Sequence, residues 1–79
     1  MKLYLLENME FDSYYSDVYD SIIVAADSED LAKRTQPNSC NDWKSTAWAS
    51  SPNNVRVTYI GEAAPNVESG VLLESFCGA

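Results

Sequence analysis

Short apolar runs separated by polar segments divide the chain into a small number of predicted elements. Residues 2–7 ("KLYLLE") and 19–26 ("YDSIIVAA") are compact and rich in strand-forming side chains. Residues 55–61 ("VRVTYIG") alternate between apolar and polar positions, and residues 71–76 ("VLLESF") predict a last strand. The unbroken run over 22–24 indicates a central strand that is covered on both faces.

The segment after the second predicted strand has the signals of one short helix, within residues 27–36. Either Asp27 or Ser28 can accept hydrogen bonds from the free amides of its first turn. Leu31 and Ala32 are the apolar pair that we expect on its buried face. A proline follows the segment and ends the helix, because proline has no amide hydrogen to donate.

The order strand, strand, helix, strand, strand predicts an α+β fold: a small, mostly antiparallel sheet of about four strands (β-β-α-β-β) with one short helix on it. We expect residues 1–79 to form a single domain. The helix can also serve as a crossover between the second and third strands. The pattern does not fix the order of the strands in the sheet.

The charge of the chain is unevenly distributed. The net charge is −7, and residues 7–30 hold eight acidic residues and no lysine or arginine. This distribution disfavours direct binding to DNA, RNA or a membrane surface, because these need clustered basic residues. It favours a basic protein partner, through attraction and faster association. A solvated acidic face that keeps a small protein soluble is the alternative explanation.

The residue types that are missing exclude several kinds of chemistry. The chain has no histidine and only three, widely spaced glycines, so it has no histidine-based catalytic group and no glycine-rich phosphate loop. The stretch "DSYYSDVYD" lacks the glycine and ligand spacing of a calcium loop. We therefore expect no enzyme activity, no metal site and no cofactor.

The cysteines and the apolar runs bear on location. No apolar stretch approaches the roughly 20 residues of a membrane span, and no signal sequence is recognised at the start. The expected location is the cytoplasm, where Cys40 and Cys77 would be free thiols. A disulfide between them is expected only in an exported protein.

Tyrosines and carboxylates gather in residues 12–20. Tyrosine is common at binding hot spots, and acids spaced along an exposed segment can stand in for nucleic-acid phosphates, as in a DNA mimic. The predicted partner-binding residues are Asp12, Tyr14, Tyr15, Asp17, Tyr19, Asp20, Glu29, Asp30 and Trp48. In the alternative, Tyr14 or Tyr15 folds back to complete a thin core. Of Trp43 and Trp48, one is expected in the core and the other is available as a contact.

Four stretches, "MKLYLLEN", "YDSIIVAADSEDLAKRTQP", "VRVTYIGEA" and "GVLLESFCGA", resemble a group of short phage- and prophage-encoded proteins of undefined role. The resemblance implies a shared fold more than a shared activity. Proteins of that group often carry a histidine before the proline that ends the helix, where this chain has Thr35 and Gln36.

A phage origin, together with small size and acidity, is similar to what anti-CRISPR proteins show, and these commonly bind a nucleic-acid-binding surface. The resemblance thus implies a non-catalytic inhibitor of a host defence nucleoprotein complex that occupies a basic groove. The alternatives are a structural or accessory phage protein that forms a homodimer through a sheet edge or an exposed aromatic, and a protein that sequesters a small ligand.

Overall fold

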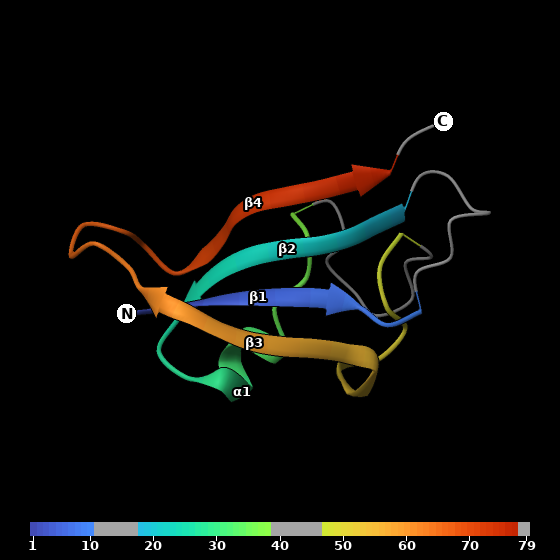
Figure 1. The fold of residues 1–79 in the computed structure, drawn as a ribbon, viewed down its shortest axis with the longest axis horizontal. Helices are drawn as coiled ribbons and strands as arrows, with labels where there is room; N and C mark the ends of the chain where they lie inside the picture. Colours follow the sequence, from blue (N-terminus) through green and yellow to red (C-terminus); the bar gives the residue numbers. More distant parts are fainter. Residues whose placement is uncertain (11–17, 39–46, 78–79) are drawn as a thin grey trace.

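The protein folds as a four-stranded antiparallel sheet with one short α-helix (Figure 1). The structure is a computed structural model and describes residues 1–10, 18–38 and 47–77. Its elements are β1 (Lys2–Asn8), β2 (Val18–Ala26), α1 (Glu29–Lys33), a 3₁₀ turn (Pro52–Asn54), β3 (Val55–Glu62) and β4 (Gly70–Cys77). The predicted antiparallel sheet and short helix are confirmed for these residues.

The strand order, which the sequence pattern left open, is β3-β1-β2-β4. Since β2 and β3 are both antiparallel to β1, they run in the same direction on either side of it. The segment that contains α1 joins these two strands and therefore crosses over β1. The predicted crossover role of the helix is correct. The two edges of the sheet are β3 and β4.

The two faces of the sheet differ in how they are covered. Tyr4 pairs with Val24, and Leu6 pairs with Ile22. These side chains form the core together with Ala32 of α1 and with Trp48, Ala49 and Val55. Leu5 and Ile23, at the alternate positions, lie on the other face and are only half-buried.

The expectation that the 22–24 run is covered on both faces is therefore wrong for the part of the chain that the structure describes. The run lies in an inner strand of the sheet, as predicted. However, α1 has only five residues and joins the core on one face. The other face, which we call the open face, carries apolar side chains without a described element packed over them.

The helix begins where the sequence predicts. The Ser28 Oγ accepts a hydrogen bond from the Leu31 amide at 3.2 Å, which makes Ser28 the N-cap. Only Ala32 is buried among the helical residues, whereas Leu31 is 53% exposed. The expectation that Leu31 lies on the buried face is wrong, because so short a helix turns a single small side chain toward the sheet.

Candidate partner-binding surface

The structure describes five of the nine predicted contact residues. Asp12, Tyr14, Tyr15 and Asp17 lie outside the described residues, and so does Trp43. Tyr19 and Asp20 lie near the start of β2, Glu29 and Asp30 in α1, and Trp48 in the segment before β3. The described residues therefore test the α1 part of the predicted surface more fully than the tyrosine-rich part.

Tyr19 is used for packing. Its ring lies against Phe76, with the two ring centroids 4.7 Å apart, and it packs against the core from a half-buried position. Its backbone N–H donates to the Ala47 carbonyl at 2.8 Å, and its own carbonyl accepts a hydrogen bond from the Asn8 side chain at 3.1 Å. Tyr19 thus ties β2 to β4, β1 and the segment that precedes β3.

Trp48 is a core residue. It is 3% exposed, so the expectation that it contacts a partner is corrected: the thin core needs its ring. Its Nε1 is buried without a hydrogen-bond partner among the described residues, and the same holds for one carboxylate oxygen of Asp20. A buried polar group without a hydrogen-bond partner costs about 1–3 kcal/mol of folding free energy. The core around Trp48 and Asp20 therefore contains two polar atoms whose hydrogen bonds the described residues do not supply.

The described contact residues do not form one patch. Asp20 lies near the start of β2, whereas Glu29 and Asp30 follow its end (Figure 1). At about 3.3 Å per residue, the strand between them separates the two groups by roughly 20 Å. Any single partner that contacts both must extend along the length of the sheet.

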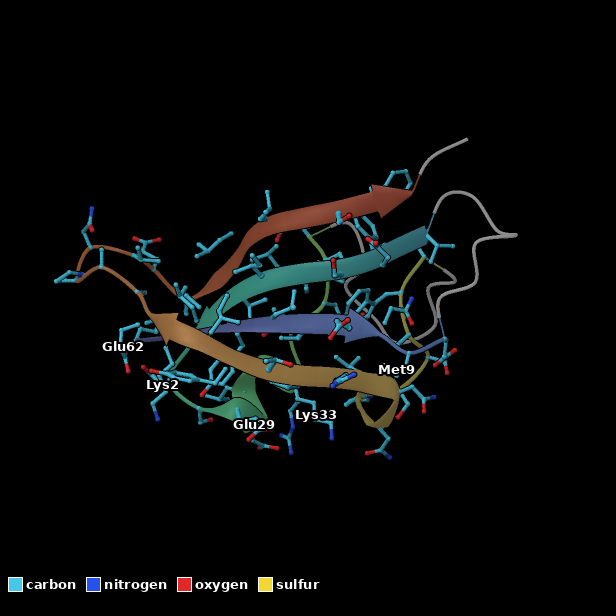
Figure 2. The ribbon with its side chains drawn as sticks, viewed as in Figure 1. Lys2, Met9, Glu29, Lys33 and Glu62 are labelled. Carbon is cyan, nitrogen blue, oxygen red and sulfur yellow. The ribbon has the colours of Figure 1, made fainter. Side chains whose placement is uncertain are left out.

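Three exposed carboxylates of the described chain lie close together in sequence at the start of α1. Asp27, Glu29 and Asp30 are all exposed, and Figure 2 shows Glu29 projecting away from the sheet. Asp30 lies 3.4 Å from the Arg34 guanidinium, a surface ion pair of small energetic value. Neither Asp27 nor Glu29 has an ion-pair partner among the described residues, so these two carboxylates are available to a cation.

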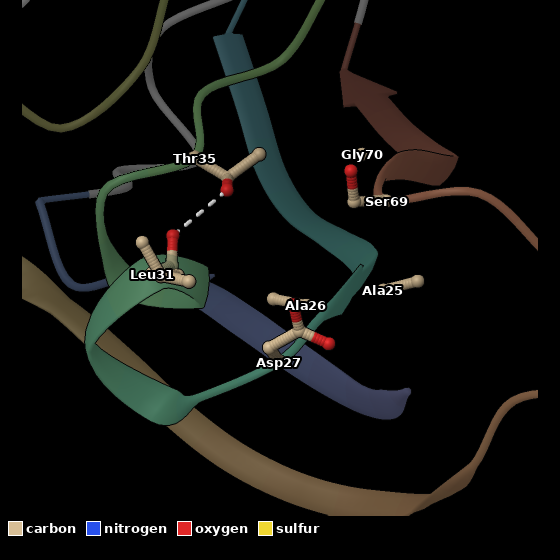
Figure 3. Close-up of a pocket in the computed structure, with 7 residues that line it drawn as sticks. All are labelled: Ala25, Ala26, Asp27, Leu31, Thr35, Ser69 and Gly70. Atoms are coloured by element: carbon tan, nitrogen blue, oxygen red, sulfur yellow. Dashed lines mark hydrogen bonds between the residues drawn. The ribbon is translucent and has the colours of Figure 1, made fainter.

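A small pocket opens beside these carboxylates (Figure 3). It has a volume of about 270 Å³ and is lined by Ala25, Ala26, Asp27, Leu31, Thr35, Ser69 and Gly70. These residues come from the end of β2, from α1 and its C-terminal end, and from the start of β4. The Thr35 hydroxyl donates to the Leu31 carbonyl at 3.0 Å, which fixes the chain on the helix side of the pocket.

The lining of this pocket combines one carboxylate and two hydroxyls with apolar side chains. The exposed Leu31 side chain and the two alanines supply the apolar wall, and Asp27 supplies the charge. Its volume lies below the range of about 300–1,000 Å³ that small-molecule sites occupy. It is better matched to a single side chain of a partner than to a whole ligand.

Residue types alone did not single out Asp27 and Leu31 as surface residues. Asp27 was expected as one of two helix caps, but Ser28 takes that role and leaves the Asp27 carboxylate at the pocket. A cap at Ser28 also sets which helical positions face the sheet. If the sequence had shown that Ser28 and not Asp27 caps the helix, Asp27 could have been identified as a surface charge.

Comparisons with known proteins identify no relative, since no family model, curated protein or solved structure matches the chain. In the described part of the chain, no three cysteine, aspartate or glutamate side chains gather closely enough to hold a metal ion. None of the described helices has the length and apolar character needed to cross a membrane.

Proposed function

We propose that the chain is a non-catalytic binding protein that occupies the basic, nucleic-acid-binding surface of a host defence complex, as an anti-CRISPR protein does. The observation that supports this most directly is a pair of exposed carboxylates without an ion-pair partner among the described residues: Asp27, which lines the pocket of Figure 3, and Glu29, two residues further along the chain. A surface that binds nucleic acid presents lysine and arginine side chains, and these are the groups that such a site attracts.

The pocket has an apolar wall and a carboxylate, which suit the apolar stem and the charged head of a basic side chain. The methylene stem of a lysine or arginine is apolar and would lie against Leu31 and Ala26, while its charged head would reach the Asp27 carboxylate. The Ser69 hydroxyl oxygen can accept a further hydrogen bond from the same head. Charge-assisted hydrogen bonds of this kind are about twice as strong as neutral ones.

Charge also determines how the complex would form. The net charge of −7 speeds the encounter with a basic surface, and the effect weakens with salt. The carboxylates at α1 then supply the close contacts. Tyr14, Tyr15 and the acids of residues 12–20 remain predicted contacts, and of these acids the structure describes Asp20, near the start of β2.

The experiment is a capture from host lysate at low and at high salt, with the bound proteins identified. The double variant Asp27→Asn/Glu29→Gln, called the pocket variant, removes the charge of Asp27 at the pocket and that of Glu29 near it in sequence, and leaves the Asp30–Arg34 pair intact. The control Glu7→Gln/Glu74→Gln removes the same charge from strands β1 and β4. We expect wild type and control to retain a nucleic-acid-binding protein at low salt, and the pocket variant to lose it.

Loss of the captured protein from both variants equally would show that only total charge matters. Retention by the pocket variant would overturn the role of Asp27 and Glu29. Circular dichroism of each variant checks that the fold is unchanged.

A further inference from the structure

The two edges of the sheet are protected to very different extents. An exposed strand edge offers unpaired N–H and C=O groups to other chains, and proteins usually blunt it with charges, bulges or covering elements. The β3 edge carries Arg56 and Glu62, has a register shift opposite Leu3 and Tyr4, and is contacted by α1. The β4 strand also has register shifts, opposite Tyr19 and Ser21 and opposite Ile23 and Val24, so the two edges differ in charge and not in regularity. The β4 edge carries a single charged residue, Glu74, and neither lysine nor proline.

The β4 strand is also the most exposed apolar element of the described chain. Leu72, Leu73 and Phe76 are 48%, 62% and 50% exposed. Leu73 pairs with Ile23, which in turn pairs with Leu5, so these three side chains form one apolar row across the open face. This exposed apolar row ends at a strand edge that no other described strand pairs with, and such a surface is typical of an interaction site.

On the open face, the charged side chains lie away from Leu73: Glu7 of β1 and Arg56 of β3, which lie 4.0 Å apart, are beside Leu5 at the other end of the row. Glu74 pairs with Ile22, a core-face residue, and its carboxylate accepts a hydrogen bond from the Asn38 amide at 2.6 Å. It therefore points to the covered face. The carboxylates of Asp27, Glu29 and Asp30 belong to the α1 segment, and α1 contacts β1, β2 and β3. Among the residues that the structure describes, the open-face neighbours of Leu73 are Ser75 and Ile23, which are neutral.

We propose that two copies of this chain associate through β4, whose antiparallel pairing about a two-fold axis joins two four-stranded sheets into one continuous sheet. A two-fold axis lets the same strand serve as both halves of the contact. Each copy carries a net charge of −7, so the contact should keep like charges apart. The one charged side chain of β4, Glu74, turns to the covered face, and α1 with its carboxylates contacts β1, β2 and β3. A basic partner would instead be drawn to the carboxylates of α1.

The register of the pairing follows from the single charge. If Glu74 lay opposite its own copy, two carboxylates would face each other, which destabilises a strand pair. A register centred on Leu73 avoids this and places the two Leu73 side chains together on the open face. The apolar rows of both copies then become continuous.

The experiment is sedimentation of the full chain from about 1 µM to about 1 mM, the range that spans moderate to weak affinities. The wild type should approach twice its monomer mass of 8.8 kDa. Leu73→Glu adds a second carboxylate beside Glu74 in each copy and should weaken the dimer by about tenfold or more. Ile60→Glu makes the same change on β3, where the side chain is 47% exposed, and should leave the dimer intact.

Several outcomes would overturn the proposal. The proposal is contradicted if the wild type stays monomeric over the whole concentration range. This holds also if the monomer binds an added extended peptide. A dimer that both variants weaken equally, or that neither weakens, places the contact elsewhere. The dimer should also persist or strengthen at high salt, whereas the complex with a basic partner should weaken, so either proposal can fail without the other.

Discussion

The ring of Phe76 lies 4.7 Å from the ring of Tyr19, with the two ring planes inclined at 60°, across the pairing of β2 with β4. The contact uses a tyrosine of the acidic, tyrosine-rich stretch to hold the edge strand. It also lies next to a register shift between Tyr19 and Ser21, where the regular ladder is interrupted. The aromatic pair thus joins β2 to β4 at a point where the ladder between them is irregular.

Phe76→Ala should destabilise the folded chain by about 1–2 kcal/mol, because it removes an aromatic pair and part of the apolar area over β2. Urea unfolding at a concentration where the chain is monomeric measures this. Leu73→Ala is the matched control on the same strand and should change the free energy of unfolding by less than about 0.5 kcal/mol. Equal effects of the two substitutions would show that the ring contact adds nothing.

Because the indole N–H of Trp48 has no hydrogen-bond partner among the described residues, two substitutions of Trp48 should differ in how much they lower the free energy of unfolding. Trp48→Ala should cost about 3–5 kcal/mol, because it empties a core position that is 3% exposed. Trp48→Phe should cost clearly less, since it keeps most of the ring volume and removes an N–H that makes no hydrogen bond among the described residues. Chemical unfolding measures both. If Trp48→Phe is as damaging as Trp48→Ala, the indole N–H does have a stabilising partner.

Glu10 should make stability depend on pH. Its carboxylate accepts hydrogen bonds from the Ser50 amide, the Ser50 hydroxyl and the Asn54 side chain, each at 2.8 Å. These bonds, the one from the Ser50 amide first, lower the pKa of Glu10 below its ordinary value of 4.5. A lowered pKa stabilises the fold fully above pH 4.5, and this contribution is lost as pH falls through the lower, folded-state pKa.

Glu10→Gln should therefore be less stable than wild type at neutral pH, and the difference should shrink once the Glu10 carboxylate of the wild type is protonated. Thermal unfolding between neutral and acidic pH measures it, with Glu68→Gln as a control that removes an exposed carboxylate of the β3–β4 connection. A difference between wild type and Glu10→Gln that stays constant across the whole range would show that the charge of Glu10 is not what stabilises the contact.

Both cysteines should titrate as free thiols. Cys40 lies outside the described residues, and Cys77 ends β4. Two thiols per chain should react in the unfolded, unreduced protein, as expected in a reducing compartment. Detection of no thiol would mean that the chain forms a disulfide, and that it is made for an oxidising environment.

The strands and the helix could be predicted from the sequence because each has a strong local signal. The alternation in residues 55–61 and the Ser28 cap act within a few residues, and β3 and α1 appear where these signals lie. The exposure of Leu31 and the burial of Trp48 could not be predicted in this way. They depend on which face the five-residue helix covers and on how the 47–55 segment returns to the sheet, and both are set by contacts distant in sequence.

The candidate site was predicted less completely for the same reason. The acidity of the α1 segment is visible in the sequence, but the pocket needs Ser69 and Gly70 from the start of β4 beside Asp27. The sequence also suggested one acidic and aromatic surface. In the structure, Asp20 lies near the start of β2 and Glu29 follows the end of β2, so the length of this strand separates the two carboxylates. That separation shows only once the extent of β2 is known.

Competition with DNA tests the proposed function most directly. A nucleic-acid-binding complex captured by the chain is purified and immobilised, and the bound chain is challenged with the DNA that the complex recognises. We predict that DNA and the chain exclude each other, that higher salt weakens the binding of the chain, and that Asp27→Asn/Glu29→Gln no longer competes while Glu7→Gln/Glu74→Gln does. Simultaneous binding of chain and DNA, with an affinity for the chain that does not change with salt, would contradict the account.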